Sequence, residues 1–281
     1  MALKPFIINS THLCKMVNYL NNNTLTLSYN KVLIMKNILS ILIIIITLGV
    51  HAQTTSGKIT YSEVINTKPD MQKAEEQGWA QWAEMVPESM TFKKQLVFNE
   101  KASMYVNIKE EEDPNEKNMV KRMARRYSNA NNQTYINSES NAFVEQQDFM
   151  GKTFLIKGEP DKITWKMTGD MKIIMSYPCL KATYKDSTET LEAWFTTEIP
   201  VAIGPEKYGQ LPGMILELTS KKNKKTLTAI VIDFKEIDSS ELSEPTVGKV
   251  VTREEYNKIV KRKMEEMRKN GSWGGRGGGR H

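Results

Sequence analysis

The sequence predicts a mainly β protein: a single curved antiparallel sheet or half-barrel with one or two covering helices. Three observations support this prediction. Apolar and polar residues alternate with a period of two through most of the chain after Gln53. Short turn-forming sequences separate the alternating segments, which favours antiparallel pairing of neighbouring strands. No intervening stretch supplies the helical crossovers that parallel pairing needs.

The first 52 residues do not fit this pattern. Residues 1–34 are rich in Asn, Leu, Thr and Ser without apolar periodicity, and we interpret them as an extension from a mis-assigned start codon. Residues 35–52 have the features of a signal peptide, with Lys36, an apolar run and the small-residue site Val50-His51-Ala52. The run is shorter than the roughly twenty residues that cross a bilayer. We expect an exported protein, periplasmic, outer-membrane-associated or secreted, without a stable membrane span; the alternative is a membrane anchor with a cytoplasmic tail.

Removal of this leader changes both charge and cysteine content. The leader carries four lysines and no acidic residue, so the net charge falls by four, from +6 to +2. Cys14 is lost with it, and the single remaining cysteine, Cys179, cannot form an internal disulfide. We interpret Cys179 as a small buried apolar residue rather than a nucleophile.

The first half of the exported chain contains strands and one helix. Residues 58–65 alternate as a strand, one face of which is formed by Ile59, Tyr61, Glu63 and Ile65. Residues 70–86 repeat apolar side chains at helical spacing after Pro69, which predicts a helix packed on the sheet. Residues 90–98 and 104–108 have the pattern of a hairpin.

A charged, partly helical excursion is expected at residues 110–132. Asp113-Pro114 has the features of a helix start, with a capping side chain before proline at the first helical position. One face of this helix carries Lys121, Arg122, Arg125 and Arg126. The basic face either binds anions or is solvated, and the solvated face is the preferred interpretation.

The remaining segments complete a β domain over residues 53–250. Further strands are expected at residues 134–137, 142–149, 152–157, 162–167, 172–175 and 227–234. A C-terminal amphipathic helix is expected at residues 251–270, beginning with a capping box at Thr252 and Glu255. The Gly- and Arg-rich tail, residues 271–281, is expected to be disordered.

The most informative stretch, residues 173–232, has two strands joined by a loop rich in proline and glycine. Such a loop holds one shape, because proline fixes φ and glycine permits positive φ. Leu211-Pro212-Gly213-Met214 fits a type II turn. We expect a structural or partner-binding role for ten residues of this stretch: Cys179, Trp194, Glu198, Pro200, Gly204, Pro205, Gly209, Leu211, Pro212 and Gly213.

Residues 210–215, Gln-Leu-Pro-Gly-Met-Ile, resemble the namesake hexapeptide of the GLPGLI family of exported proteins from Bacteroidetes-type bacteria. Residues 193–200 and Gly204-Pro205 also match the family pattern, and the resemblance spans residues 58–233. Gln210 replaces the first glycine, so either no positive φ is needed there or the turn is altered. The resemblance implies an exported β protein and carries no established activity.

The residue inventory restricts the chemistry. Two of the three histidines, His12 and His51, lie in the leader and His281 lies in the tail, which argues against triad catalysis and histidine-based zinc sites. No phosphate-binding glycine loop follows a strand. A carboxylate pair remains open, drawn from Glu189, Glu192, Glu198, Glu206 and Glu217.

We therefore expect a non-enzymatic envelope protein with no catalytic residue, cofactor or metal. Its expected partner is an outer-membrane protein or a lipid-like ligand, bound by the concave face and the rigid loop, and not a nucleic acid. The alternative is a carboxylate-dependent hydrolase acting on envelope or extracellular polymers.

Overall fold

The structure is a computed structural model that describes residues 15, 36, 55–76, 78, 80–111, 115–128 and 130–269. The chain divides into two compact units, Met1–Gln53 and Thr54–His281, and the fold below is that of the second. The expected start-codon extension, signal peptide and C-terminal tail lie outside the described residues, apart from Lys15 and Lys36. Among the helices that are described, none has the length and apolar character needed to cross a membrane.

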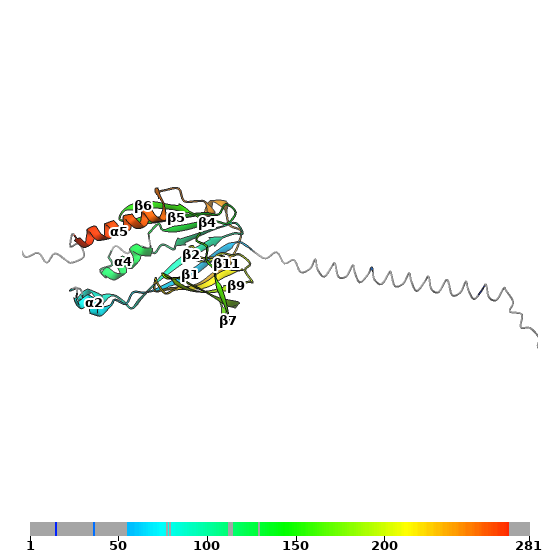
Figure 1. Ribbon diagram of the computed structural model, residues 1–281, viewed down its shortest axis with the longest axis horizontal. Helices are drawn as coiled ribbons and strands as arrows, with labels where there is room; N and C mark the ends of the chain where they lie inside the picture. The colour runs from blue at the N-terminus through cyan, green and yellow to red at the C-terminus, as the bar shows by residue number, and fades with distance from the viewer. Residues whose placement is uncertain are drawn as a thin grey trace, which may run out of the picture. The chain divides into compact units, whose positions relative to one another are not determined.

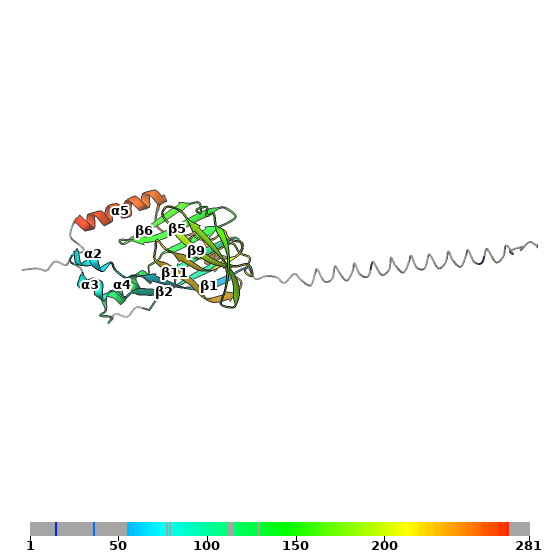
Figure 2. The ribbon, with the colours of Figure 1, turned by 60° about the horizontal axis from the view of Figure 1, so that its bottom comes forward.

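Twelve strands form one sheet, which confirms the mainly β prediction. Figures 1 and 2 show that the sheet is curved. The spatial order is β12-β6-β5-β4-β3-β2-β1-β11-β10-β9-β8-β7, so β12 and β7 form the two edges. All neighbours are antiparallel except β12 and β6. The strands are β1 (Gly57–Asn66), β2 (Ser89–Phe98), β3 (Ala102–Asn107), β4 (Gln133–Asn137), β5 (Ala142–Phe149), β6 (Lys152–Gly158), β7 (Lys166–Ile174), β8 (Tyr177–Lys185), β9 (Thr190–Thr196), β10 (Met214–Ser220), β11 (Lys225–Phe234) and β12 (Lys249–Val251).

Short side chains at the hairpin ends explain the tight connections. Asn99 Oδ1 accepts hydrogen bonds from the backbone N–H groups of Lys101 and Ala102, at 2.9 and 2.8 Å, between β2 and β3. Asn137 plays the same part between β4 and β5, and Asp186 between β8 and β9. Asn and Asp favour such turns because their side chains bond the backbone a few residues ahead.

The helix expected at residues 70–86 is two short helices, α2 (Met71–Glu76) and α3 (Ala80–Met85). Gly78 separates them with a φ of +73°, which a right-handed helix cannot contain. Figures 1 and 2 show α2 beyond the strand ends rather than over the sheet. Helical spacing predicted the local structure without predicting this break.

The strand expected at residues 162–167 is also different. β7 begins at Lys166 and continues to Ile174, through the break expected between the strands at residues 162–167 and 172–175. Its pairing with β8 shifts register between Met167 and Met171, and Gly169 has a φ of +84°. Gly169 therefore lies in a β-bulge within a single strand.

The main core fills the concave side of the sheet around β1 and β8–β11. Strand residues such as Tyr61, Phe98 and Phe195 pack there, and Ile199 and Leu211 reach them from the loop between β9 and β10. This loop, rather than the helix expected at residues 70–86, covers that part of the sheet. A smaller core packs η1 (Ser239–Leu242) on the other face of β2–β6 through Leu242.

The last helix, α5 (Arg253–Lys269), packs on β6. Tyr256 contacts Phe149 and Phe154 in edge-on ring pairs. A capping box starts the helix: Glu255 N–H donates to Thr252 Oγ1, and Thr252 N–H donates to Glu255 Oε2. This start places Arg253 beside the concave face of β5.

Candidate functional site

The loop of residues 197–213 is shaped by close backbone approach. A Cβ on Gly213 would lie 2.0 Å from the Thr196 carbonyl oxygen, and one on Gly209 would lie 2.7 Å from that of Ala202. A Cβ on Gly204 would lie 2.8 Å from the Ile215 side chain. Glycine is therefore required at all three positions because the space is taken. Pro205 and Leu211 are buried in the same loop, whereas Glu198, Pro200 and Pro212 are exposed.

The type II turn expected at residues 211–214 is wrong. Gly213 has a φ of +155°, far from the value near +80° that this turn requires, and its N–H donates to the carbonyl of Leu211 at 2.7 Å. Gln210 has a φ of +65°, so the substitution for glycine did not remove the positive φ. Gln210 Nε2 donates to the Asp161 carbonyl, and its Oε1 accepts from Ile163 N–H, which anchors the side chain.

Trp194 and Cys179 lie outside the loop itself, and Cys179 belongs to the same core cluster as the loop residues Ile199 and Leu211. Trp194 is half-buried on the outer face of β9, with Lys172 Nζ 4.4 Å and Lys181 Nζ 5.6 Å from its ring centroid. Cys179 is fully buried, and this burial raises the pKa of its thiol to about 11. A thiol with such a pKa is mostly protonated at neutral pH, as expected for a structural cysteine.

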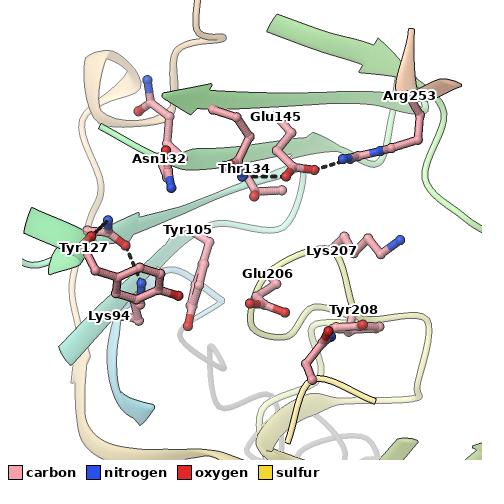
Figure 3. A pocket seen from close by; sticks show the side chains of 14 residues that line it. Lys94, Tyr105, Tyr127, Asn132, Thr134, Glu145, Glu206, Lys207, Tyr208 and Arg253 are labelled. Carbon is pink, nitrogen blue, oxygen red and sulfur yellow. Dashed lines mark hydrogen bonds and ion pairs between the residues drawn. The ribbon is translucent and has the colours of Figure 1, made fainter. Parts of the chain in front are cut away.

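A polar cavity of about 280 Å³ lies on the concave side of β2–β5. Loop residues 206–208 face the strands across it, and Tyr127 of α4 (Met119–Ser128) and Arg253 of α5 stand at its sides (Figure 3). We call it the concave pocket; its lining residues are Lys94, Tyr105, Asn107, Tyr127, Asn132, Gln133, Thr134, Glu145, Gln147, Glu206, Lys207, Tyr208, Asn223 and Arg253. None of the ten residues expected to act in the loop is among them, although the loop itself supplies Glu206, Lys207 and Tyr208.

Strand pairing explains how the lining side chains come together. Tyr105 of β3 pairs with Thr134 of β4, and Thr134 pairs with Glu145 of β5. Directly paired residues in an antiparallel sheet share one face, so these three side chains form a row across the concave surface. Lys94 and Asn107 form a parallel row on β2 and β3.

The floor of the pocket holds a buried ion-pair network. Glu63 of β1 is 1% exposed, and its two carboxylate oxygens lie 3.2 Å from Lys94 Nζ and 3.5 Å from Lys225 Nζ. Lys225 also pairs with Glu206. Burial lowers the pKa of Lys94, and its attraction to Glu63 only partly offsets this. Burial acts the same way on Lys225, but Glu206 and Glu63 outweigh it and raise the pKa.

Polar side chains fix the wall between β3 and α4. Lys94 Nζ donates to Asn107 Oδ1 at 2.5 Å, and Asn107 Nδ2 donates to the carbonyls of Tyr127 and Ala130 at 3.2 and 2.9 Å. The Tyr127 ring packs against Phe92 with centroids 4.6 Å apart and lies 4.5 Å from Lys94 Nζ. The helix α4 (Met119–Ser128) is thereby tied to the pocket by its last turn.

The opposite rim is held by a second set of ion pairs. Arg253 pairs with Glu145, which also accepts a 2.6 Å hydrogen bond from Gln147 Nε2. Lys207 pairs with Asp161 in the segment before β7. Ion pairs therefore connect α5 to β5, and the loop to Asp161, along this rim.

Among the residues that line the pocket, one buried side-chain hydroxyl has no hydrogen-bond partner in the described part of the chain. Tyr105 is 7% exposed, and within the described residues no group donates to or accepts from its hydroxyl. Figure 3 shows this hydroxyl in the space between Tyr127 and Glu206. A buried hydroxyl normally has a hydrogen-bond partner, so an unpaired one in a cavity indicates a place for a ligand or water group.

The alternating pattern of residues 58–65 contains one residue that indicates this site. Glu63 falls on the same face of residues 58–65 as Ile59 and Tyr61, and an acidic residue on an apolar face predicts a buried partner. The partners themselves come from β2 and β11, far along the chain. In the described part of the chain, no group of three or more His, Cys, Asp or Glu side chains is placed to hold a metal ion.

Comparison with protein families matches residues 96–258 to the family described as N-glycanase peptide, N-terminal domain. This match covers more than half of the chain and every lining residue of the concave pocket except Lys94. No curated protein matches the chain.

Two crystal structures of PNGF-II, in the P21 and C2 space groups, are similar in fold. Each shares 16% sequence identity with a TM-score of 0.49. The matched part covers 74% of this chain and 34% or 33% of the PNGF-II chain, so this chain spans about a third of the PNGF-II length.

The family match corrects two expectations. The resemblance to the GLPGLI family is wrong, because the stretch that suggested it lies inside residues matched to the N-glycanase domain. Its glycines are dictated by backbone crowding, which an unrelated β domain can share. The expectation of a non-enzymatic envelope protein is overturned with it, since the matched family is named as the N-terminal domain of an N-glycanase.

Proposed function

Since this chain belongs to the N-glycanase peptide, N-terminal domain family, we propose that it works in the processing of N-linked glycans and holds their carbohydrate in the concave pocket. The observation that carries this proposal is the unpaired, buried hydroxyl of Tyr105 inside a polar cavity. A sugar hydroxyl both donates and accepts hydrogen bonds, and so can satisfy this group.

The composition of the pocket supports a hydroxylated ligand. Its walls combine amide, hydroxyl and carboxylate groups with the rings of Tyr105, Tyr127 and Tyr208. Tyrosine rings offer apolar faces for the C–H groups of a sugar, and the amides and carboxylates offer partners for its hydroxyls. The volume of about 280 Å³ is close to the lower end of ligand pockets, roughly 300–1,000 Å³. These walls suit a saccharide better than the lipid-like ligand expected from the sequence.

Pre-formed contacts hold the walls in position before a ligand arrives. Asn107 is held by Lys94 and by two backbone carbonyls, and Glu145 is held by Arg253 and Gln147. A site whose side chains are already oriented loses less conformational entropy on binding. We further propose that the chain acts outside the cytoplasm, as the leader at residues 35–52 predicts.

The test is binding of an N-glycopeptide to the purified full chain by titration calorimetry, with the same peptide lacking the glycan as the reference. We expect the glycosylated peptide to bind at least about tenfold more tightly. Asn223→Trp places a ring at the mouth of the pocket in an exposed turn and should abolish this preference. Lys222→Trp is the matched control, one residue away and outside the lining, and should bind as the parent does. Equal binding of both peptides would overturn the proposal.

A second candidate is hydrolysis by this chain itself. Glu145 of β5 and Glu206 of the loop line different walls of one pocket, and a pair of carboxylates can serve as acid and base (Figure 3). Mass spectrometry of the glycopeptide after incubation would then detect released glycan, and Glu206→Gln should abolish the release. Absence of release by the parent chain rules out this second candidate and leaves the binding proposal standing.

A further inference from the structure

Every charge of the concave pocket is already compensated by an opposite charge. Lys94, Lys207 and Arg253 line the pocket and pair with Glu63, Asp161 and Glu145 in turn. The remaining lining charge, Glu206, pairs with Lys225. The lining charges and their partners thus contain equal numbers of cations and carboxylates, and the set is neutral.

The innermost part of the pocket is unfavourable for an added negative charge. Burial raises the pKa of Tyr105 well above its usual value, and the negative charges of Glu206 and Glu63 raise it further. The same two residues raise the pKa of Tyr127 after burial. An anionic substituent placed here would meet the same field and would have to displace a carboxylate from its lysine.

A neutral hydroxyl meets no such cost. Tyr105 remains protonated and offers one donor and two acceptor positions. The ion pairs around it can stay intact when an uncharged polyol enters. The pocket therefore combines a free hydrogen-bonding position with a closed set of charges.

Resting on the proposed function, we infer that the concave pocket selects uncharged, hydroxyl-rich saccharides over acidic ones, and that the hydroxyl of Tyr105 is a specificity-determining contact for them. The ligand class is a neutral sugar unit; saccharides carrying carboxylate, sulfate or phosphate groups at this unit are excluded. The charge set of Glu63, Lys94, Lys225 and Glu206 enforces the exclusion.

The experiment measures binding of N-acetylglucosamine and N-acetylglucosamine 6-phosphate to the full chain, by ligand-observed NMR titration. We expect the neutral sugar to bind at least tenfold more tightly than the phosphate. Tyr105→Phe keeps the ring and removes one neutral hydrogen bond, so it should weaken the neutral sugar roughly two- to tenfold. Tyr135→Phe is the matched control, because Tyr135 is equally buried on the neighbouring strand but outside the pocket lining, and should leave binding unchanged.

A second variant tests the charge set without touching Tyr105. Glu206→Gln removes the carboxylate that opposes anions and leaves Lys225 with Glu63 alone, so the preference for the neutral sugar should fall at least threefold. Equal affinity for the two sugars in the parent chain, or identical behaviour of Tyr105→Phe and Tyr135→Phe, would overturn this inference while the glycopeptide preference still stands. Equal binding of the glycosylated and unglycosylated peptides by the parent chain would overturn the proposed function itself.

Discussion

Two clusters of paired charges occupy opposite faces of the same sheet. The inner cluster, Glu63, Lys94, Lys225 and Glu206, lies on the concave side, where Glu63 is 1% and Lys94 7% exposed. The outer cluster surrounds Trp194, with Lys172 paired to Glu217 and Lys181 paired to Glu192, whose side chain is 31% exposed. Both clusters join lysines to glutamates from different segments of the chain, and they differ mainly in their access to water.

Burial changes what such pairs do. Water screens the outer pairs, which hold Trp194 between two lysines and contribute little each. The inner pairs have lost most of their hydration, so each partner depends on the others and removal of one leaves an uncompensated charge. Buried charges are therefore costly to disturb, and they fix the geometry of the cavity above them.

The largest difference between the two clusters is expected for Glu63→Gln. It leaves Lys94 and Lys225 buried with less compensation, so the free energy of unfolding should fall by about 3 kcal/mol or more. Glu192→Gln removes the matching carboxylate of the outer cluster and should cost less than about 1 kcal/mol. Urea unfolding followed by circular dichroism measures both. Similar losses in the two variants would show that burial does not distinguish the clusters.

The loop that carries Glu206 should be the next most sensitive part. In Gly213→Ala the new Cβ would meet the Thr196 carbonyl, and positive φ adds strain, so we expect a loss of about 2 to 3 kcal/mol. Gly151→Ala also has positive φ, but open space surrounds its Cβ, so about 1 kcal/mol is expected. Thermal unfolding compares the two. Equal losses of stability in Gly213→Ala and Gly151→Ala would contradict the close approach of Gly213 to the Thr196 carbonyl.

A smaller effect is expected from Trp194→Leu on the outer face. It removes two cation–ring contacts and should reduce the free energy of unfolding by about 1 kcal/mol. Glycopeptide affinity should not change, because Trp194 lies outside the concave pocket. Calorimetric titration measures the glycopeptide affinity of this variant. Weaker binding than by the parent chain would contradict the placement of Trp194 outside the carbohydrate site.

The smallest effect concerns Cys179. Burial raises the pKa of its thiol to about 11, so the folded protein keeps a protonated thiol while an unfolded one ionises at lower pH. This contribution to stability is therefore present below the unfolded pKa of about 9 and declines as pH rises from there towards 11. Iodoacetamide labelling followed by peptide mass spectrometry should be slow at pH 8 and fast in urea. Rapid labelling of the folded chain at pH 8 would contradict the burial.

The sequence predicted most of the strands but not the pocket. Alternation placed Ile59, Tyr61 and Glu63 on one face, because side-chain direction in a strand depends only on position. The pocket depends on which strands become neighbours and on how residues 205–208 fold over them. A local sequence pattern predicts neither of these. The proline- and glycine-rich loop attracted functional interpretation, yet its glycines serve backbone packing, while Glu206 and Tyr208 between them face the cavity.

A crystal structure of the full chain with bound N-acetylglucosamine would locate the carbohydrate site directly. We predict a sugar in the concave pocket, with one of its hydroxyls within hydrogen-bond distance of Tyr105 Oη and the Glu63, Lys94, Lys225 and Glu206 ion pairs intact. A sugar bound on another surface, with the concave pocket holding water alone, would contradict the assignment of this pocket as the carbohydrate site.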